Sequence, residues 1–178
     1  TVYSKRAGNK PFPVIKAMAL APDGVLWVGG ALGLYSLRDG VLTDVEGFGE
    51  RDIYSLTFGR DSTLWVGTEQ GLYRYRDGSV RRYTTKDGLS NNNVHRIAEL
   101  SDGSLWIGTR GGISRISDGE ITGLTFASAF SGEYIRDLVE TEDGAVWVGT
   151  YGGGLARLKD GDVKRLTSSN GLPNNYIS

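Results

Sequence analysis

Every tryptophan in the chain lies in one short phrase that occurs four times. The phrase is an aliphatic residue, tryptophan, a β-branched residue and glycine, and its tryptophans are Trp27, Trp65, Trp106 and Trp147. They lie 38, 41 and 41 residues apart. A period near 40 residues is typical of repeated supersecondary units that build their core between neighbours. The sequence therefore predicts a repeat protein.

Each repeat contains short runs that favour β-structure, separated by Asp-Gly or Gly-rich turns. In the third repeat these parts are, in order, residues 94–100, Asp102-Gly103, 105–109, Gly111-Gly112, 113–116 and Asp118-Gly119. Asp-Gly favours the type I′ hairpin turn, because this turn needs positive φ at both central residues. We therefore expect type I′ turns at both Asp-Gly junctions, and each repeat is predicted to be a four-stranded antiparallel meander.

No segment between the repeats has helical periodicity, so the fold class is predicted to be all-β. Four-stranded units with a signature tryptophan and a period near 40 are typical of β-propeller blades. In such blades the tryptophans are expected to fill the wedge between neighbouring sheets. The alternative, an aromatic platform for a sugar or a base, is the less economical interpretation of four equivalent positions.

The repeat positions predict about four blades. The expected division is a last strand of a preceding blade at residues 1–10, blades at 11–48, 49–90, 91–131 and 132–173, and the start of a further blade at 174–178. On this division the chain starts inside one blade and ends inside another, as expected for part of a larger ring.

Composition excludes several classes of function. The 20 basic and 21 acidic side chains nearly cancel, which argues against a nucleic-acid partner. The chain has no cysteine, so thiolate metal sites and disulfides are excluded. No apolar run approaches the roughly 20 residues of a membrane-spanning helix, so this segment is expected to make no direct membrane contact.

The sequence offers little catalytic chemistry. His95 is the only histidine, and one histidine without cysteine cannot form a common zinc site. The glycines Gly152, Gly153 and Gly154 are not followed by the lysine of a phosphate-binding loop. We therefore predict no catalytic residue, no metal and no cofactor.

Ligand-binding residues are expected where loops converge at one end of the propeller. In an antiparallel meander, the loops between the second and third strands share an end with the linkers that enter each first strand. Residues of these loops predicted to bind ligand are Glu69, Gln70, Arg110, Tyr151, Asn92, Asn93, Glu133 and Tyr134. Planar amides, a guanidinium and tyrosines suit a carbohydrate or another polyhydroxylated or anionic small molecule. The alternative is that the asparagines serve only the geometry of turns.

The order of these elements resembles the two-component regulator propeller repeat. The residues that carry the resemblance are 102–109, 112–115 and 170–175, with a second lead-in at 87–93. The resemblance implies a periplasmic or extracytoplasmic sensor module of a histidine kinase, a hybrid two-component system or a diguanylate cyclase. It also implies a ring of about seven blades and no shared catalytic residues. The expected function is thus a non-enzymatic module that passes ligand or association state to a downstream kinase or cyclase.

Two other functions and several assembly states stay open at this point. A propeller lyase similar to streptogramin lyases would need paired histidine and glutamate groups with a metal, and a protein-interaction platform would need neither. Four blades of a larger ring would leave apolar faces exposed, which favours self-association through blade faces or edges, such as a closed dimer of eight blades. A tighter four-bladed ring, or a ring completed by flanking sequence, are the alternatives.

Overall fold

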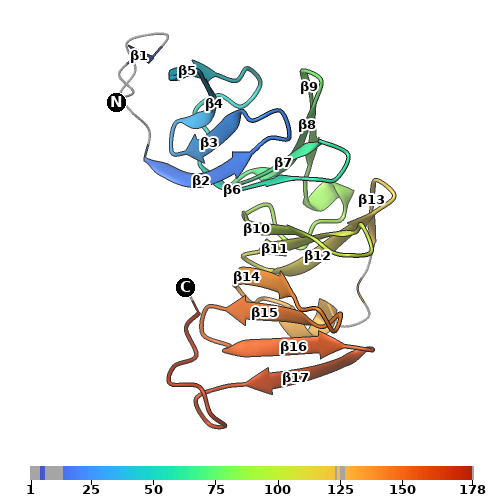
Figure 1. The fold of residues 1–178 in the computed structure, drawn as a ribbon. Helices are drawn as coiled ribbons and strands as arrows, with labels where there is room; N and C mark the ends of the chain where they lie inside the picture. Colours follow the sequence, from blue (N-terminus) through green and yellow to red (C-terminus); the bar gives the residue numbers. More distant parts are fainter. Residues whose placement is uncertain (1–4, 7–13, 123, 125–126, 178) are drawn as a thin grey trace.

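The computed structural model describes residues 5–6, 14–122, 124 and 127–177 and consists of four antiparallel sheets (Figure 1). Each sheet has its four consecutive strands in sequence order, as predicted for propeller blades. Two short 3₁₀ turns, η1 (Thr85–Asp87) and η2 (Ala127–Phe130), interrupt the linkers. No helix among the described residues is long and apolar enough to span a membrane.

The blades follow one another along the chain. Blade 1 contains β2 (Ile15–Leu20), β3 (Leu26–Gly30), β4 (Gly33–Arg38) and β5 (Val41–Asp44). Blade 2 contains β6 (Ile53–Phe58), β7 (Leu64–Thr68), β8 (Gly71–Arg76) and β9 (Ser79–Tyr83). Blade 3 contains β10 (Val94–Glu99), β11 (Leu105–Thr109), β12 (Gly112–Ser117) and β13 (Glu120–Thr122). Blade 4 contains β14 (Ile135–Glu140), β15 (Val146–Thr150), β16 (Leu155–Lys159) and β17 (Asp162–Leu166).

The four blades form an open row and not a closed four-bladed ring. Blades 1 and 4 lie at its two ends, and the first strands β2, β6, β10 and β14 lie next to one another along its inner side (Figure 1). At the free end of blade 1 the side chains of Ile15, Met18 and Leu20 are 51%, 63% and 67% exposed. The expected uncovered apolar face is therefore present on blade 1.

At the two ends of the chain, the predicted division into blades can be compared with the structure only in part. Most of residues 1–10, predicted to belong to a preceding blade, lie outside the described residues, and the described β1 (Lys5–Arg6) pairs in parallel with β5. At the other end Tyr176 forms an antiparallel bridge with Tyr151. The predicted division into blades at 11–48, 49–90, 91–131 and 132–173 stays a prediction in its detail.

The two kinds of Asp-Gly junction adopt different turns. Between the third and fourth strands both residues have positive φ, for example 50° at Asp77 and 79° at Gly78, which is the predicted type I′ geometry. Between the first and second strands only one residue has positive φ, for example Gly103 at 80°. The type I′ prediction is wrong there, because three residues separate Leu100 from its partner Ser104. The loop instead keeps Asp102 at negative φ, where its carboxylate accepts the Ser104 N–H at 2.9 Å.

Apolar packing joins each blade to the next. Trp65 lies in a buried cluster with Ile97 and Ile107 of blade 3, and Trp106 lies in a cluster with Leu138 and Val148 of blade 4. Trp65 and Trp106 thus fill the wedge between neighbouring blades, as predicted, and the partly buried Trp27 packs against the cluster of blade 2. Burying a side chain of this size stabilises the fold by roughly 2–3 kcal/mol.

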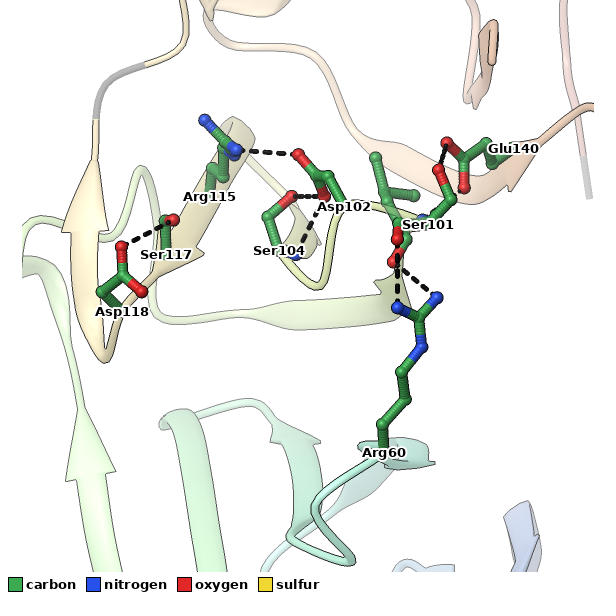
Figure 2. Close-up of polar contacts among 9 residues, drawn as sticks. Arg60, Ser101, Asp102, Ser104, Arg115, Ser117, Asp118 and Glu140 are labelled. Carbon is green, nitrogen blue, oxygen red and sulfur yellow. Dashed lines mark hydrogen bonds and ion pairs between the residues drawn. The ribbon is translucent and has the colours of Figure 1, made fainter. Parts of the chain in front are cut away.

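Hydrogen bonds at the turn end of the blades add a second connection between neighbours (Figure 2). The Glu140 carboxylate accepts from the Ser101 N–H at 2.6 Å and from its hydroxyl at 2.7 Å. Glu99 accepts the Arg60 N–H at 2.9 Å in the same way. Between blades 1 and 2 the equivalent residues are Pro22, which has no N–H, and Phe58, which has no acceptor. The junction between blades 1 and 2 therefore lacks both the backbone N–H donor and the side-chain acceptor of this hydrogen bond.

Candidate ligand-binding cleft

A β-bulge occurs near the start of every first strand. In β10 the pairing with β11 passes from Val94 to Arg96, so that His95 has no partner in the ladder. The corresponding unpaired residues in β2, β6 and β14 are Lys16, Tyr54 and Arg136. Bulges redirect side chains and are common next to functional sites. Here each blade directs one polar or aromatic side chain toward the inner side of the row.

These four side chains line a cleft of about 500 Å³. Its lining residues are Lys16, Tyr54, His95, Arg96, Tyr134, Arg136 and Asp137. A volume of this size is in the range of small-molecule sites. The cleft lies at the end where the loops after the second strands meet the linkers, because the Arg110 N–H bonds to the Asn93 carbonyl and the Tyr151 N–H to the Tyr134 carbonyl.

Aromatic rings form a ladder along the cleft. The rings of Tyr54 and His95 stack at 4.5 Å between centroids with 20° between planes, and His95 lies 4.4 Å from Tyr134. Tyr151 follows at 5.9 Å from Tyr134, and Tyr176 at 4.8 Å from Tyr151. Residues from three blades and from the segment after blade 4 thus contribute to one aromatic surface.

A chain of hydrogen bonds fixes the orientation of His95. Arg136 donates to the Tyr134 hydroxyl oxygen at 3.1 Å, and this hydroxyl lies 3.1 Å from His95 Nδ1. A guanidinium can only donate, so the Tyr134 hydroxyl proton remains for Nδ1. Neutral His95 accepts this proton at Nδ1 when it carries its own proton on Nε2.

The charges in the cleft fall into paired and unpaired groups. Lys16 pairs with Asp52 at 2.6 Å, and Arg96 pairs with Asp137 at 2.7 Å. Arg110 and Arg136 lie 6.0 and 5.3 Å from the centroid of the Tyr134 ring. Neither of them forms an ion pair with any carboxylate in the part of the chain that the structure describes.

The surroundings of the cleft shift the pKa values of two side chains, His95 and Tyr54. Burial, and then the positive charges of Arg136, Arg110 and Lys16, lower the pKa of His95 to about 4. Burial, and then the negative charge of Asp52, raise the pKa of Tyr54 to about 12. Both side chains are therefore neutral at neutral pH, and both rings are suited to stacking and to neutral hydrogen bonds.

The structure distributes the eight predicted ligand-binding residues between the cleft and the loops that support it. Tyr134 lines the cleft, and Arg110 and Tyr151 lie about 6 Å from the centroid of its ring, outside the lining itself. Glu69 Oε2 and Asn93 Oδ1 are buried oxygens without a partner in the described residues.

The remaining three predicted residues make contacts within the fold. The Asn92 side-chain oxygen Oδ1 accepts the Thr85 N–H at 2.8 Å, which braces the linker. Glu133 pairs with Arg165 at 2.8 Å, and the Gln70 side chain donates to Glu69 at 3.3 Å. These contacts do not test the predicted binding role, which stays a prediction.

The bulged residues Lys16, Tyr54, His95 and Arg136 were absent from the predicted set. One signal points to them: each directly follows the β-branched residue that begins a first strand. The four side chains differ in chemistry, so no single residue type is repeated at this position of the blades.

The comparisons with known proteins agree with this architecture. The family model described as two component regulator propeller matches residues 88–111 and 129–152. No curated protein sequence matches the chain.

Solved structures show that the fold is a β-propeller. The extracellular domain described as that of a hybrid two-component system from B. thetaiotaomicron has a TM-score of 0.78 at 20% identity over 94% of this chain. PorZ, a surface component of the type IX secretion system of Porphyromonas gingivalis, has a TM-score of 0.70 at 15% identity over 92% of this chain. Virginiamycin B lyase from Staphylococcus aureus has a TM-score of 0.66 at 17% identity over 86% of this chain. The chain spans 26%, 28% and 56% of the lengths of these three proteins.

Proposed function

From the two-component regulator propeller repeats that this chain contains, we propose that it is a non-enzymatic, extracytoplasmic sensor module of a two-component-type signalling protein. Its cleft binds a small polyhydroxylated molecule, and the bound state is passed to a kinase or cyclase. The observation that carries the proposal is the bulge at Lys16, Tyr54, His95 and Arg136, which directs one side chain from every blade to the same cleft.

The chemistry of the cleft favours a sugar ring. The rings of Tyr54, His95 and Tyr134 pack on one another and present their edges, two hydroxyl groups and an imidazole to the cleft, which suits the hydroxyl groups of a sugar.

The fold shared with virginiamycin B lyase makes an enzyme the alternative function. The lyase hypothesis requires paired histidine and glutamate groups that hold a metal. The described residues contain no group of three or more His, Cys, Asp or Glu side chains placed to hold a metal ion, and Nδ1 of His95 already bonds to Tyr134. The donor set therefore favours binding over metal-assisted elimination.

The test is a binding screen on the full chain. Neutral and acidic oligosaccharides would be screened by thermal shift, with calorimetry for compounds that raise the melting temperature. We expect at least one to bind, and Tyr134→Ala to abolish binding. Arg81→Gln is the matched control, because Arg81 packs on Tyr83 in the outer strand β9, away from the cleft.

Two outcomes would contradict the proposal. One is a ligand that binds Tyr134→Ala and the parent chain equally well. The other is conversion of the ligand to a product, followed by NMR of the ligand, which would establish the enzymatic alternative.

A further inference from the structure

The basic side chains of the cleft are not all neutralised. Lys16 and Arg96 have carboxylate partners within 2.7 Å, whereas Arg110 and Arg136 both contact the ring of Tyr134 and have none among the described residues. Both arginines are exposed to solvent. Guanidinium groups present paired donors that match a planar or tetrahedral oxyanion.

The two unpaired arginines lie beside one ring of the aromatic ladder. Asp52 lies near Tyr54, where it helps to raise the pKa of that side chain, but it is paired with Lys16. Arg136 and Arg110 lie near Tyr134, and their charges help to lower the pKa of His95. A ligand in the cleft would therefore meet two cations without carboxylate partners near Tyr134.

The loop and the strand that supply the two arginines are held in place independently of any ligand. The Arg110 N–H bonds to the Asn93 carbonyl at 2.9 Å. Arg136 is the bulged residue between Ile135, which is fully buried, and Asp137. The two backbone positions are thus fixed by strand pairing, and only the side chains need to adjust to a ligand.

We propose that Arg110 and Arg136 together bind an oxyanion carried on the ligand, so that the cleft selects an acidic carbohydrate, with a carboxylate or sulfate group, over a neutral one. This inference rests on the proposed function, since it names the ligand class of the same cleft. The sugar lies in the cleft against Tyr134 and His95, and its oxyanion accepts hydrogen bonds from the guanidinium groups of Arg110 and Arg136 near the Tyr134 ring.

The single histidine provides a direct reporter of this site. Because the chain has one histidine, the imidazole Cε1–H signal in a proton NMR spectrum belongs to His95. Sodium glucuronate, glucose 6-sulfate, glucose and sodium sulfate would be titrated into the full chain at fixed pH and ionic strength. We expect a saturable shift with both acidic sugars, and at least about tenfold weaker binding of glucose.

Substitutions separate charge recognition from contacts with the sugar ring. Arg110→Gln and Arg136→Gln are each expected to weaken glucuronate binding by about tenfold and to weaken glucose binding less than glucuronate binding. Arg157→Gln is the control, because Arg157 pairs with Asp143 at the turn end of blade 4, away from the cleft. This control should bind glucuronate as the parent chain does.

Three outcomes would overturn the inference. Glucose and glucuronate could shift the His95 Cε1–H signal with equal affinity in the parent chain and in both arginine variants. The cleft would then bind sugars without distinguishing their charge, and the proposed function would stand. If sulfate alone binds as tightly as glucose 6-sulfate, the sugar ring makes no contribution and the carbohydrate assignment fails. If neither acidic sugar gives a saturable shift, Arg110 and Arg136 do not form the site.

Discussion

Gly108 of blade 3 faces the side chain of Ile135, which begins the first strand of blade 4. A Cβ atom built on Gly108 would lie 2.7 Å from Ile135 Cγ2, so glycine is the only residue that fits without displacement. The same relationship holds between Gly67 and Val94 at 2.9 Å. The glycine two residues after each tryptophan therefore leaves space for the side chain that begins the next blade.

The first prediction is that Gly108→Ala lowers the free energy of unfolding by about 1–3 kcal/mol, because the new methyl group overpacks the contact with Ile135. Gly108 has no positive φ in the structure, so backbone strain does not contribute. Urea unfolding of Gly108→Ala, Ile135→Ala and the double variant forms a double-mutant cycle. Less than additive loss in the double variant is expected, and strict additivity would show that the two residues are not coupled.

The second prediction concerns the bond between Glu140 and Ser101. Glu140→Ala removes the acceptor of two hydrogen bonds that join blade 3 to blade 4, and it should lower the free energy of unfolding by about 1 kcal/mol. Glu142→Ala is the control, since the exposed Glu142 lies in the adjacent turn and forms no side-chain hydrogen bond with the other described residues. Equal effects of the two substitutions in urea unfolding would argue that the rim contact adds nothing to stability.

The repeat and the strand order could be predicted from sequence because their signals are local. Trp106 and the Asp118-Gly119 turn each mark one element of a blade, and the structure has those elements where the signals lie. The turn at Asp102 was predicted wrongly because Asp-Gly is compatible with two hairpin loops. The length of the loop, which decides between them, depends on which residues of the two strands pair.

The cleft depends on features that are not local. His95 is directed into it by a bulge, and a bulge is a property of the pairing between β10 and β11 and not of either strand alone. Its contacts with Tyr54 and Tyr134 join residues about 40 positions apart. By contrast the proximity of Arg110 to Tyr134 could be predicted from sequence, since both lie in loops that share one end of the repeat, and their binding role stays a prediction.

The third prediction concerns pH. The pKa of His95 falls from 6.5 to about 4 on folding, so the folded state favours the neutral ring. The unfolded chain then binds more protons between these values, and stability from this group is complete above pH 6.5 and is lost as pH falls toward 4. His95 is the only histidine, so His95→Gln should make the free energy of unfolding nearly constant from pH 7 to about 5. Urea unfolding across this range is the measurement, and an unchanged slope in His95→Gln would contradict the assignment.

The fourth prediction concerns the uncovered face of blade 1. Met18 is 63% exposed, whereas its counterparts Leu56 and Ile97 in blades 2 and 3 are 8% and 2% exposed because a preceding blade covers them. A face built for burial but left open favours association of this chain with itself. We expect sedimentation velocity to show a concentration-dependent dimer, and Met18→Lys to shift it to monomer because a charge would be buried in the contact. Val80→Lys, on the outer strand β9, is the control and should dimerise as the parent chain does. A parent chain that is monomeric at every concentration, or a loss of association in Val80→Lys, would exclude this face as the contact.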